Sequence, residues 1–131
     1  MMAELKYPED LKYAESDEWV RIQGDVATVG LSDYAQDALN DIVYLELKEV
    51  GTAIAAGESF GEVESVKAAS DVILPIGGEI IEVNTALEDE PEIINSDPYG
   101  EGWLVKVRVT DDSPLADLMD AGAYKAYNET R

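Results

Sequence analysis

The sequence of 131 residues predicts a mainly β fold, a β-sandwich or a small barrel, with helices near its start and at its end. Short apolar or alternating runs recur along the middle of the chain, and turn-forming residues separate them. At this length we expect one domain over residues 1–131. Its strand-rich core covers about residues 18–110, and a helical segment covers residues 113–128.

The strands are expected at the short apolar runs. Alternation favours residues 18–22 and 25–29, with Gln23-Gly24 as the hairpin turn between them. Residues 42–47 are typical of a strand buried on most of both faces. Further strands are expected at residues 60–63, 72–76, 79–83 and 103–109. Turns are expected at Gly51, Gly57, Gly77-Gly78 and residues 95–100.

Helix signals lie on either side of these strands. Ser32 and Asp33 are good N-caps, so a two-turn helix is expected from Tyr34 to about Asn40. Ser113-Pro114 indicates a second helix start, with serine at the N-cap and proline at the first helical position. Gly122 is expected to divide that helix. An apolar stripe at helical spacing is expected to pack on the core: Leu115, Leu118, Met119, Ala123, Ala126 and Tyr127.

The chain is strongly acidic, with 29 acidic and 9 basic residues and a net charge of −20. Such a surface repels phosphate backbones and anionic lipid, so neither nucleic acid nor a membrane is expected as a partner. Partners with basic docking faces are favoured. Adaptation to high salt would explain the same composition.

Cysteine and histidine are both absent from the sequence. This excludes cysteine or histidine nucleophiles and bases, disulfides, and zinc sites of the usual ligand type, and no metal site is expected. Residues 1–6 have neither the apolar run of a signal peptide nor the arginine-rich character of a transit peptide. No apolar stretch is long enough to span a bilayer, so a cytoplasmic location is expected.

Lys67 is the candidate functional residue. It lies between the strands expected at residues 60–63 and 72–76, at the tip of a hairpin. A lysine amine has a pKa of about 10.4 in water, and nothing at an exposed turn would lower it, so catalysis by this amine is not expected. Ala68 and Ala69 leave room for an enzyme that acylates the lysine. Nearby carboxylates would mark the site by charge, namely Glu62, Glu64 and Asp71.

The frame around this lysine is Glu64-Ser65-Val66-Lys67-Ala68-Ala69-Ser70-Asp71. It resembles the lipoyl-attachment motif of the H proteins of the glycine cleavage system. The resemblance extends over nearly the whole chain, through residues 11–13, 18–20, 29–36, 41–47, 78–84 and 95–103. Several blocks in one order at compatible spacing make the resemblance highly specific.

The resemblance implies a lipoyl-domain-like barrel-sandwich hybrid of two antiparallel sheets, with short flanking helices and a C-terminal helix. Lys67 would carry lipoic acid in amide linkage, so the chain would be a non-catalytic carrier rather than an enzyme. The lipoyl group would provide the sulfur chemistry that a chain without cysteine lacks. We expect the carrier to act as a monomer.

The resemblance also implies partners. The carrier would take the aminomethyl group of glycine from the pyridoxal-phosphate-dependent glycine decarboxylase (P protein) to the folate-dependent aminomethyltransferase (T protein). Dihydrolipoamide dehydrogenase (L protein) would reoxidise the arm. A lipoate ligase or a lipoyl/octanoyl transferase would install it.

In this family the loaded arm folds back into a cleft on the carrier. The matching positions are Ser16 and Glu18, just before Trp19, and Asp71, four residues after the lysine. Carboxylates there would favour the cationic form of the aminomethyl group. Two positions depart from the family pattern: Asp17 replaces a usual histidine, and Lys48 replaces a usual proline. Asp17 is expected to add negative charge beside the cleft.

Other classes of protein fit the same residues less well. A biotin carrier usually has methionines beside its lysine, where this chain has Val66 and Ala68. A lipoyl domain of a 2-oxo-acid dehydrogenase is normally joined to a linker and an acyltransferase domain. An enzyme using paired carboxylates is conceivable, but no pair stands out. An H-like carrier for lipoate relay or sulfur metabolism remains the alternative.

Overall fold

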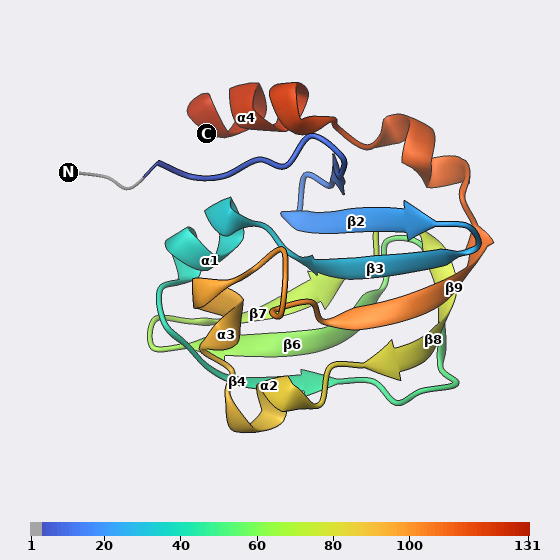
Figure 1. The fold of residues 1–131 in the computed structure, drawn as a ribbon, viewed down its shortest axis with the longest axis horizontal. Coiled ribbons are helices and arrows are strands. Elements are labelled where there is room, and N and C mark those ends of the chain that lie inside the picture. Colours follow the sequence, from blue (N-terminus) through green and yellow to red (C-terminus); the bar gives the residue numbers. More distant parts are fainter. Residues whose placement is uncertain (1–3) are drawn as a thin grey trace.

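The computed structural model describes residues 4–131 and consists of two antiparallel β-sheets packed face to face (Figure 1). Residues 1–3 of the expected domain and of the N-terminal segment lie outside the described residues. The larger sheet has six strands in the order β1-β2-β3-β9-β8-β5. These are β1 Lys12–Tyr13, β2 Glu18–Gln23, β3 Val26–Leu31, β9 Val105–Asp111, β8 Gly77–Val83 and β5 Ala53–Ile54.

The smaller sheet has three strands in the order β4-β6-β7, and it carries Lys67 at one end. Its strands are β4 Ile42–Leu47, β6 Ser59–Ser65 and β7 Ala69–Ile73. Inward-facing residues of both sheets form one buried core, which includes Val29 and Val107 from the larger sheet and Val63 from the smaller. The mainly β, two-sheet architecture confirms the predicted fold class.

Short helices close the ends of the sheets. Ser32 caps α1 (Asp33–Leu39) by accepting a hydrogen bond from the backbone N–H of Ala35 at 3.1 Å, which confirms the predicted start. Two further helices in the β8–β9 connection were not predicted: α2 (Ala86–Asp89) and α3 (Ile93–Ser96). The chain continues after β9 through the 3-10 helix η1 (Ser113–Asp117) to α4 (Ala121–Glu129).

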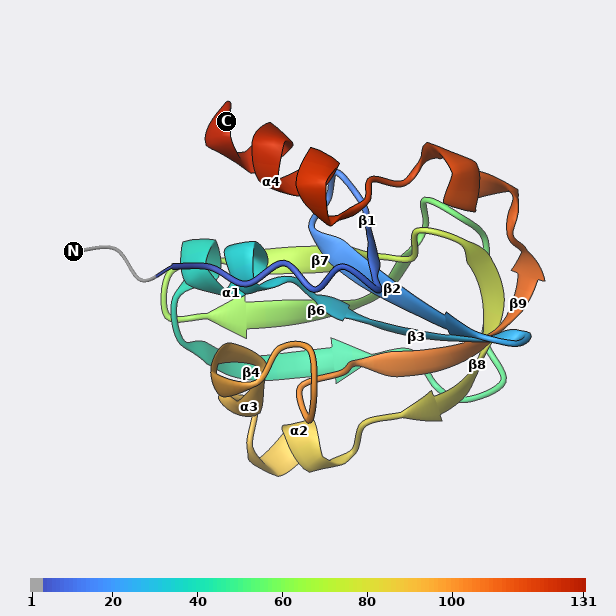
Figure 2. The ribbon, with the colours of Figure 1, turned by 45° about the horizontal axis from the view of Figure 1, so that its top comes forward.

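A second, aromatic core lies beneath α4. Figure 2 shows α4 and the N-terminal segment on the same side of the molecule, beside β1. The Tyr124 ring stacks on the Tyr13 ring with centroids 4.6 Å apart. Trp19 is fully buried in the same cluster, and its indole N–H donates to the Pro98 carbonyl at 3.0 Å. Tyr13 at the end of β1 and Trp19 in β2 both belong to this core, so it includes residues on either side of the turn between these strands.

Three predictions about the strands were wrong. The strand expected at residues 72–76 is β7, Ala69–Ile73, so residues 74–76 lie outside it. In β4 only Ile42 and Leu45 are buried, while Val43 and Tyr44 are about half exposed. The reason is that β4 is an edge strand with a bulge between Ile42 and Tyr44. Gly77 and Gly78 do not form a turn. They begin β8, where a Cβ on Gly78 would meet the carbonyl of Arg108 at 2.9 Å.

The C-terminal stripe also differs from the prediction. The helical segment is interrupted at Met119, which pairs with Tyr13 in a β-bridge, and not at Gly122. Asp120 then caps a new helix by accepting from Ala123 N at 2.8 Å. Ala123 and Ala126 are exposed, and the buried side chains of α4 are Ala121, Tyr124 and Asn128. The N-cap of η1 is Asp112, so Ser113 is the first residue of the helix and not the N-cap that the sequence predicted.

Candidate functional site

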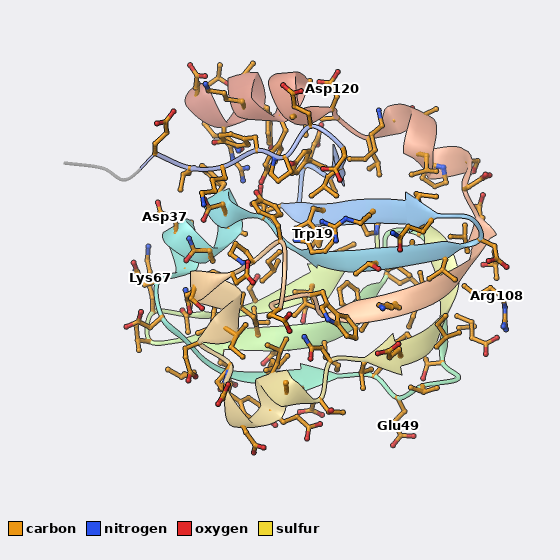
Figure 3. The ribbon with its side chains drawn as sticks, viewed as in Figure 1. Trp19, Asp37, Glu49, Lys67, Arg108 and Asp120 are labelled. Carbon is orange, nitrogen blue, oxygen red and sulfur yellow. The ribbon has the colours of Figure 1, made fainter. Side chains whose placement is uncertain are left out.

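Lys67 lies at the tip of the β6–β7 hairpin, as its position in the sequence predicts. The two strands pair from Ser59 and Ile73 up to Glu64 and Ala69, and the residues between Glu64 and Ala69 form the turn. Lys67 is exposed, and Figure 3 shows it beside α1, at the end of the molecule opposite Arg108. The side chain therefore projects from an end where two strands reverse direction.

The Ser65 hydroxyl organises this turn. It accepts hydrogen bonds from the backbone N–H of Lys67 at 3.1 Å and of Ala68 at 3.0 Å. It also donates to the Ala68 carbonyl at 3.1 Å, and the Ser65 backbone N–H donates to the same carbonyl at 2.8 Å. A side chain that replaces backbone partners in this way holds a turn in one shape. The tip is thus exposed but ordered.

The tip leans on the connection between α1 and β4. The backbone N–H of Val66 donates to the Asp41 carbonyl at 3.0 Å. The Lys67 ammonium donates to the Ala38 carbonyl, in the last turn of α1, at 3.4 Å. That contact is long and exposed, so an incoming acyl donor can displace it at little cost. Both acceptors are backbone carbonyls, which every residue has, so no side-chain pattern in the sequence predicts these two contacts.

Glu18 is buried, with 1% of its surface exposed. One carboxylate oxygen accepts from the backbone N–H of Ile73 at 2.9 Å, and the other accepts a very short hydrogen bond from the Ser16 hydroxyl. Desolvation by burial raises the pKa of Glu18 to about 7, although both hydrogen bonds oppose that rise. Ser16 and Glu18 therefore contact each other, and both carboxylate oxygens of Glu18 are already bonded.

Asp17, between them, does not present a free negative charge. Its carboxylate accepts from the Tyr124 hydroxyl at 2.8 Å and forms a two-point ion pair with Arg131, at 2.5 and 3.1 Å. The Arg131 guanidinium also lies over the rings of Tyr34 and Tyr127. The expectation that Asp17 adds charge beside the cleft was wrong, because the pair neutralises it.

Asp71 lies on β7, opposite Glu62 of β6, which in turn lies opposite Glu46 of β4. These three carboxylates and Lys48 are among the residues that line an open groove of about 570 Å³. Ser16 and Glu18 are not among the described residues of that lining. The connection between Asp71 and Glu18 runs through Ile73, two residues further along β7.

In residues 4–131 no group of three or more candidate ligand side chains is placed to hold a metal ion. None of the described helices has the length and apolar character needed to cross a membrane.

Comparison with known proteins gives a consistent result. The family model for the glycine cleavage H-protein matches residues 11–131. The glycine cleavage system H protein of Bacteroides thetaiotaomicron is 52% identical over 122 residues, covering 93% of this chain and 97% of the relative. That of Alcanivorax borkumensis is 56% identical over 119 residues, covering 91% and 93%. A crystal structure of the H protein from Mycobacterium marinum superposes with a TM-score of 0.86 at 44% identity, covering 93% of this chain and 98% of that one.

Proposed function

The chain belongs to the glycine cleavage H-protein family, whose members are non-catalytic lipoyl carriers, and on that premise we propose that Lys67 carries lipoic acid in amide linkage. The lipoyl group would supply the sulfur chemistry that the chain lacks. The carrier takes the aminomethyl group of glycine from glycine decarboxylase (P protein) to the aminomethyltransferase (T protein), and then presents its dithiol to dihydrolipoamide dehydrogenase (L protein). Residues 1–131 act as one lipoyl-carrier domain, modified by a lipoate ligase or a lipoyl/octanoyl transferase.

The observation that carries the proposal is the combination of exposure and order at the hairpin tip. The Asp41 carbonyl accepts from the backbone N–H of Val66, and the Ser65 hydroxyl accepts from that of Lys67, so the backbone of the tip is held at two successive residues. The Lys67 amine itself has one long contact, to the Ala38 carbonyl. An acyl group can therefore be attached to Nζ without disturbing a buried side chain. Acylation also removes the charge of the ammonium group. The contact between Nζ and the Ala38 carbonyl then loses its ionic character.

Three residues are proposed to receive the loaded end of the arm: Ser16, Glu18 and Asp71. Asp71 offers an exposed carboxylate that favours the cationic form of an amine. Glu18 is reached only if the Ser16 hydroxyl turns away, because Ser16 and Ile73 already occupy its oxygens. Asp71 therefore provides an open carboxylate and Glu18 a buried one, and the two are connected through Ile73 of β7.

The cleft assignment is tested with the double variant Glu18→Gln, Asp71→Asn. We expect the aminomethyl adduct to be lost faster from this variant, because two groups that stabilise its cationic form are neutral. Lipoylation of Lys67 should be unaffected. The measurement is the lifetime of the loaded carrier by mass spectrometry, and an unchanged lifetime would remove the assignment.

The carrier role is tested with Lys67→Arg, which keeps the positive charge but cannot form the amide. Intact-mass spectrometry of the wild-type protein should show the addition of one lipoyl group mapped to Lys67. Reconstituted glycine decarboxylation should be lost in Lys67→Arg and retained in Lys125→Arg, a control at an exposed lysine of α4. Activity that survives in Lys67→Arg would refute the proposal.

Lipoylation without glycine decarboxylation would instead favour the H-like carrier for lipoate relay or sulfur metabolism. The monomeric state and the cytoplasmic location stay predictions from the sequence.

A further inference from the structure

The connection between α1 and β4 is held by one side chain from another part of the chain, Asn95 of α3. Its Oδ1 accepts from the backbone N–H of Ile42 at 2.8 Å. Its Nδ2 donates to the Asn40 carbonyl at 2.8 Å and to Gln36 Oε1 at 3.0 Å. Both N–H donors and the carbonyl of the amide are thus used. They join the end of α1, the bend after it and the start of β4.

The bend at Asn40 requires such support. Asn40 has a φ of 66°, in the left-handed region that few residues other than glycine adopt. Such a conformation costs about 1 kcal/mol or more and persists where the surroundings hold it. The bond from Asn95 to the Asn40 carbonyl acts directly on this residue. Without it, the bend can relax toward a more common conformation.

The same bend is the support for the hairpin tip. Asp41, which follows Asn40, accepts from the backbone N–H of Val66. Ala38, two residues before Asn40, accepts from the Lys67 ammonium. The two acceptors that touch the tip therefore lie on either side of the residue that Asn95 holds.

We propose that Asn95 is a positioning residue for the attachment lysine: its amide fixes the α1–β4 bend, and the bend holds Val66 and Lys67 in the shape presented to the modifying enzyme. The inference rests on the proposed function of Lys67. In the described residues Asn95 makes no hydrogen bond to Lys67, and it acts through the Gln36 side chain and the backbone of residues 38–42.

The test compares three variants of the full chain. Asn95→Ala removes all three bonds. Asn95→Asp keeps the acceptor for Ile42 but places an oxygen against the Asn40 carbonyl and Gln36 Oε1. Asn84→Ala is the matched control, because the buried Asn84 also donates two bonds to backbone carbonyls, of Glu101 at 2.7 Å and of Trp103 at 2.8 Å, far along the chain from the tip.

Two measurements are made on each variant. The first is amide hydrogen exchange at Val66, which reports the bond to Asp41 without any cofactor. The second is kcat/KM for attachment of lipoic acid by a lipoate ligase. For both Asn95 variants we expect faster exchange at Val66 and a loss of about tenfold in kcat/KM, since small displacements of a reacting group are costly. Asn84→Ala should match the wild type in both after correction for its global stability.

Protected Val66 and a wild-type attachment rate in the Asn95 variants would overturn the inference. Equal losses in the Asn84 control would overturn it too, because the effect would then be one of global stability. If Asn95→Ala fails to fold, Asn95→Asp gives the same two readouts. A wild-type protein that is never lipoylated would refute the proposed function instead, and exchange at Val66 would still decide the role of Asn95.

Discussion

The Glu18 carboxylate accepts a hydrogen bond from the backbone N–H of Ile73 at 2.9 Å and so joins the two sheets. Glu18 begins β2 of the six-stranded sheet, and Ile73 ends β7 of the three-stranded sheet. Glu18 is the only carboxylate among the buried polar residues of the described chain. Burial raises the pKa of Glu18, so the ionisation of this carboxylate changes near neutral pH. Ser16, which donates to Glu18, is exposed at the surface of the proposed cleft.

Glu18→Gln should change how stability depends on pH. The pKa of Glu18 is raised from 4.5 to about 7 in the folded protein. The protonated carboxyl therefore contributes fully to the free energy of unfolding below pH 4.5, and this contribution is lost as pH rises through 7. Above pH 7 the buried charge costs about 3 kcal/mol. The amide has no such cost, so the stability of Glu18→Gln relative to wild type should rise between pH 5 and pH 8.

Urea unfolding at these two pH values measures that difference. Glu15→Gln is the control, because Glu15 lies in the same turn but is exposed. A pH-independent difference between Glu18→Gln and wild type would show that the carboxylate does not ionise in this range.

Ser65→Ala should loosen the turn at Lys67 while leaving the fold intact. It removes the acceptor of the Lys67 and Ala68 N–H groups, so amide exchange at Ala68 should accelerate and lipoylation should slow. Ser70→Ala is the control in the same hairpin, because the Ser70 hydroxyl makes one poor contact, at 3.4 Å to the Asp71 carbonyl. Equal rates of lipoylation in the two variants would contradict a role for the Ser65 hydroxyl.

The Asp17–Arg131 pair should stabilise the fold more than an exposed ion pair does. Its two side chains are 17% and 27% exposed, and the guanidinium also packs on two tyrosine rings. A double-mutant cycle with Asp17→Asn and Arg131→Gln should give a coupling of about 1–2 kcal/mol. The exposed pair of Arg108 and Glu79 should give less than about 1 kcal/mol. Equal couplings would argue against the packing of Arg131.

Gly30→Ala should be strongly destabilising. A Cβ at Gly30 would lie 2.7 Å from Cζ2 of the fully buried Trp19 ring, which has no room to move. We expect a loss of about 2–3 kcal/mol in the free energy of unfolding, measured by urea denaturation. Gly122→Ala is the control: a Cβ there would have 3.7 Å to its nearest neighbour, and alanine favours a helix by up to about 1 kcal/mol. Gly30→Ala with wild-type stability would show that the indole can shift.

Local patterns in the sequence predicted much of the fold. The cap at Ser32 and the turn at Gly24 appear where expected, because a cap and a hairpin turn depend on a few neighbouring residues. The exposure of Val43 and Tyr44 could not be predicted in the same way. It depends on the place of β4 at the edge of a sheet, and the strand order is set by residues far apart in the chain.

In the candidate site, too, some features follow from the local sequence and others depend on the tertiary structure. The frame around Lys67 and its place at a hairpin tip follow from the sequence alone, because the frame is one continuous segment between two strands that pair with each other. The tertiary structure decided the contacts between distant parts of the chain: the Asp41 carbonyl accepts from Val66 at the tip, Asn95 bonds the Asn40 carbonyl, Arg131 pairs with Asp17, and Glu18 is buried against Ile73. These contacts join residues up to 114 positions apart. They arise when the packing of two sheets and a terminal helix brings polar groups together away from water, which no local pattern encodes.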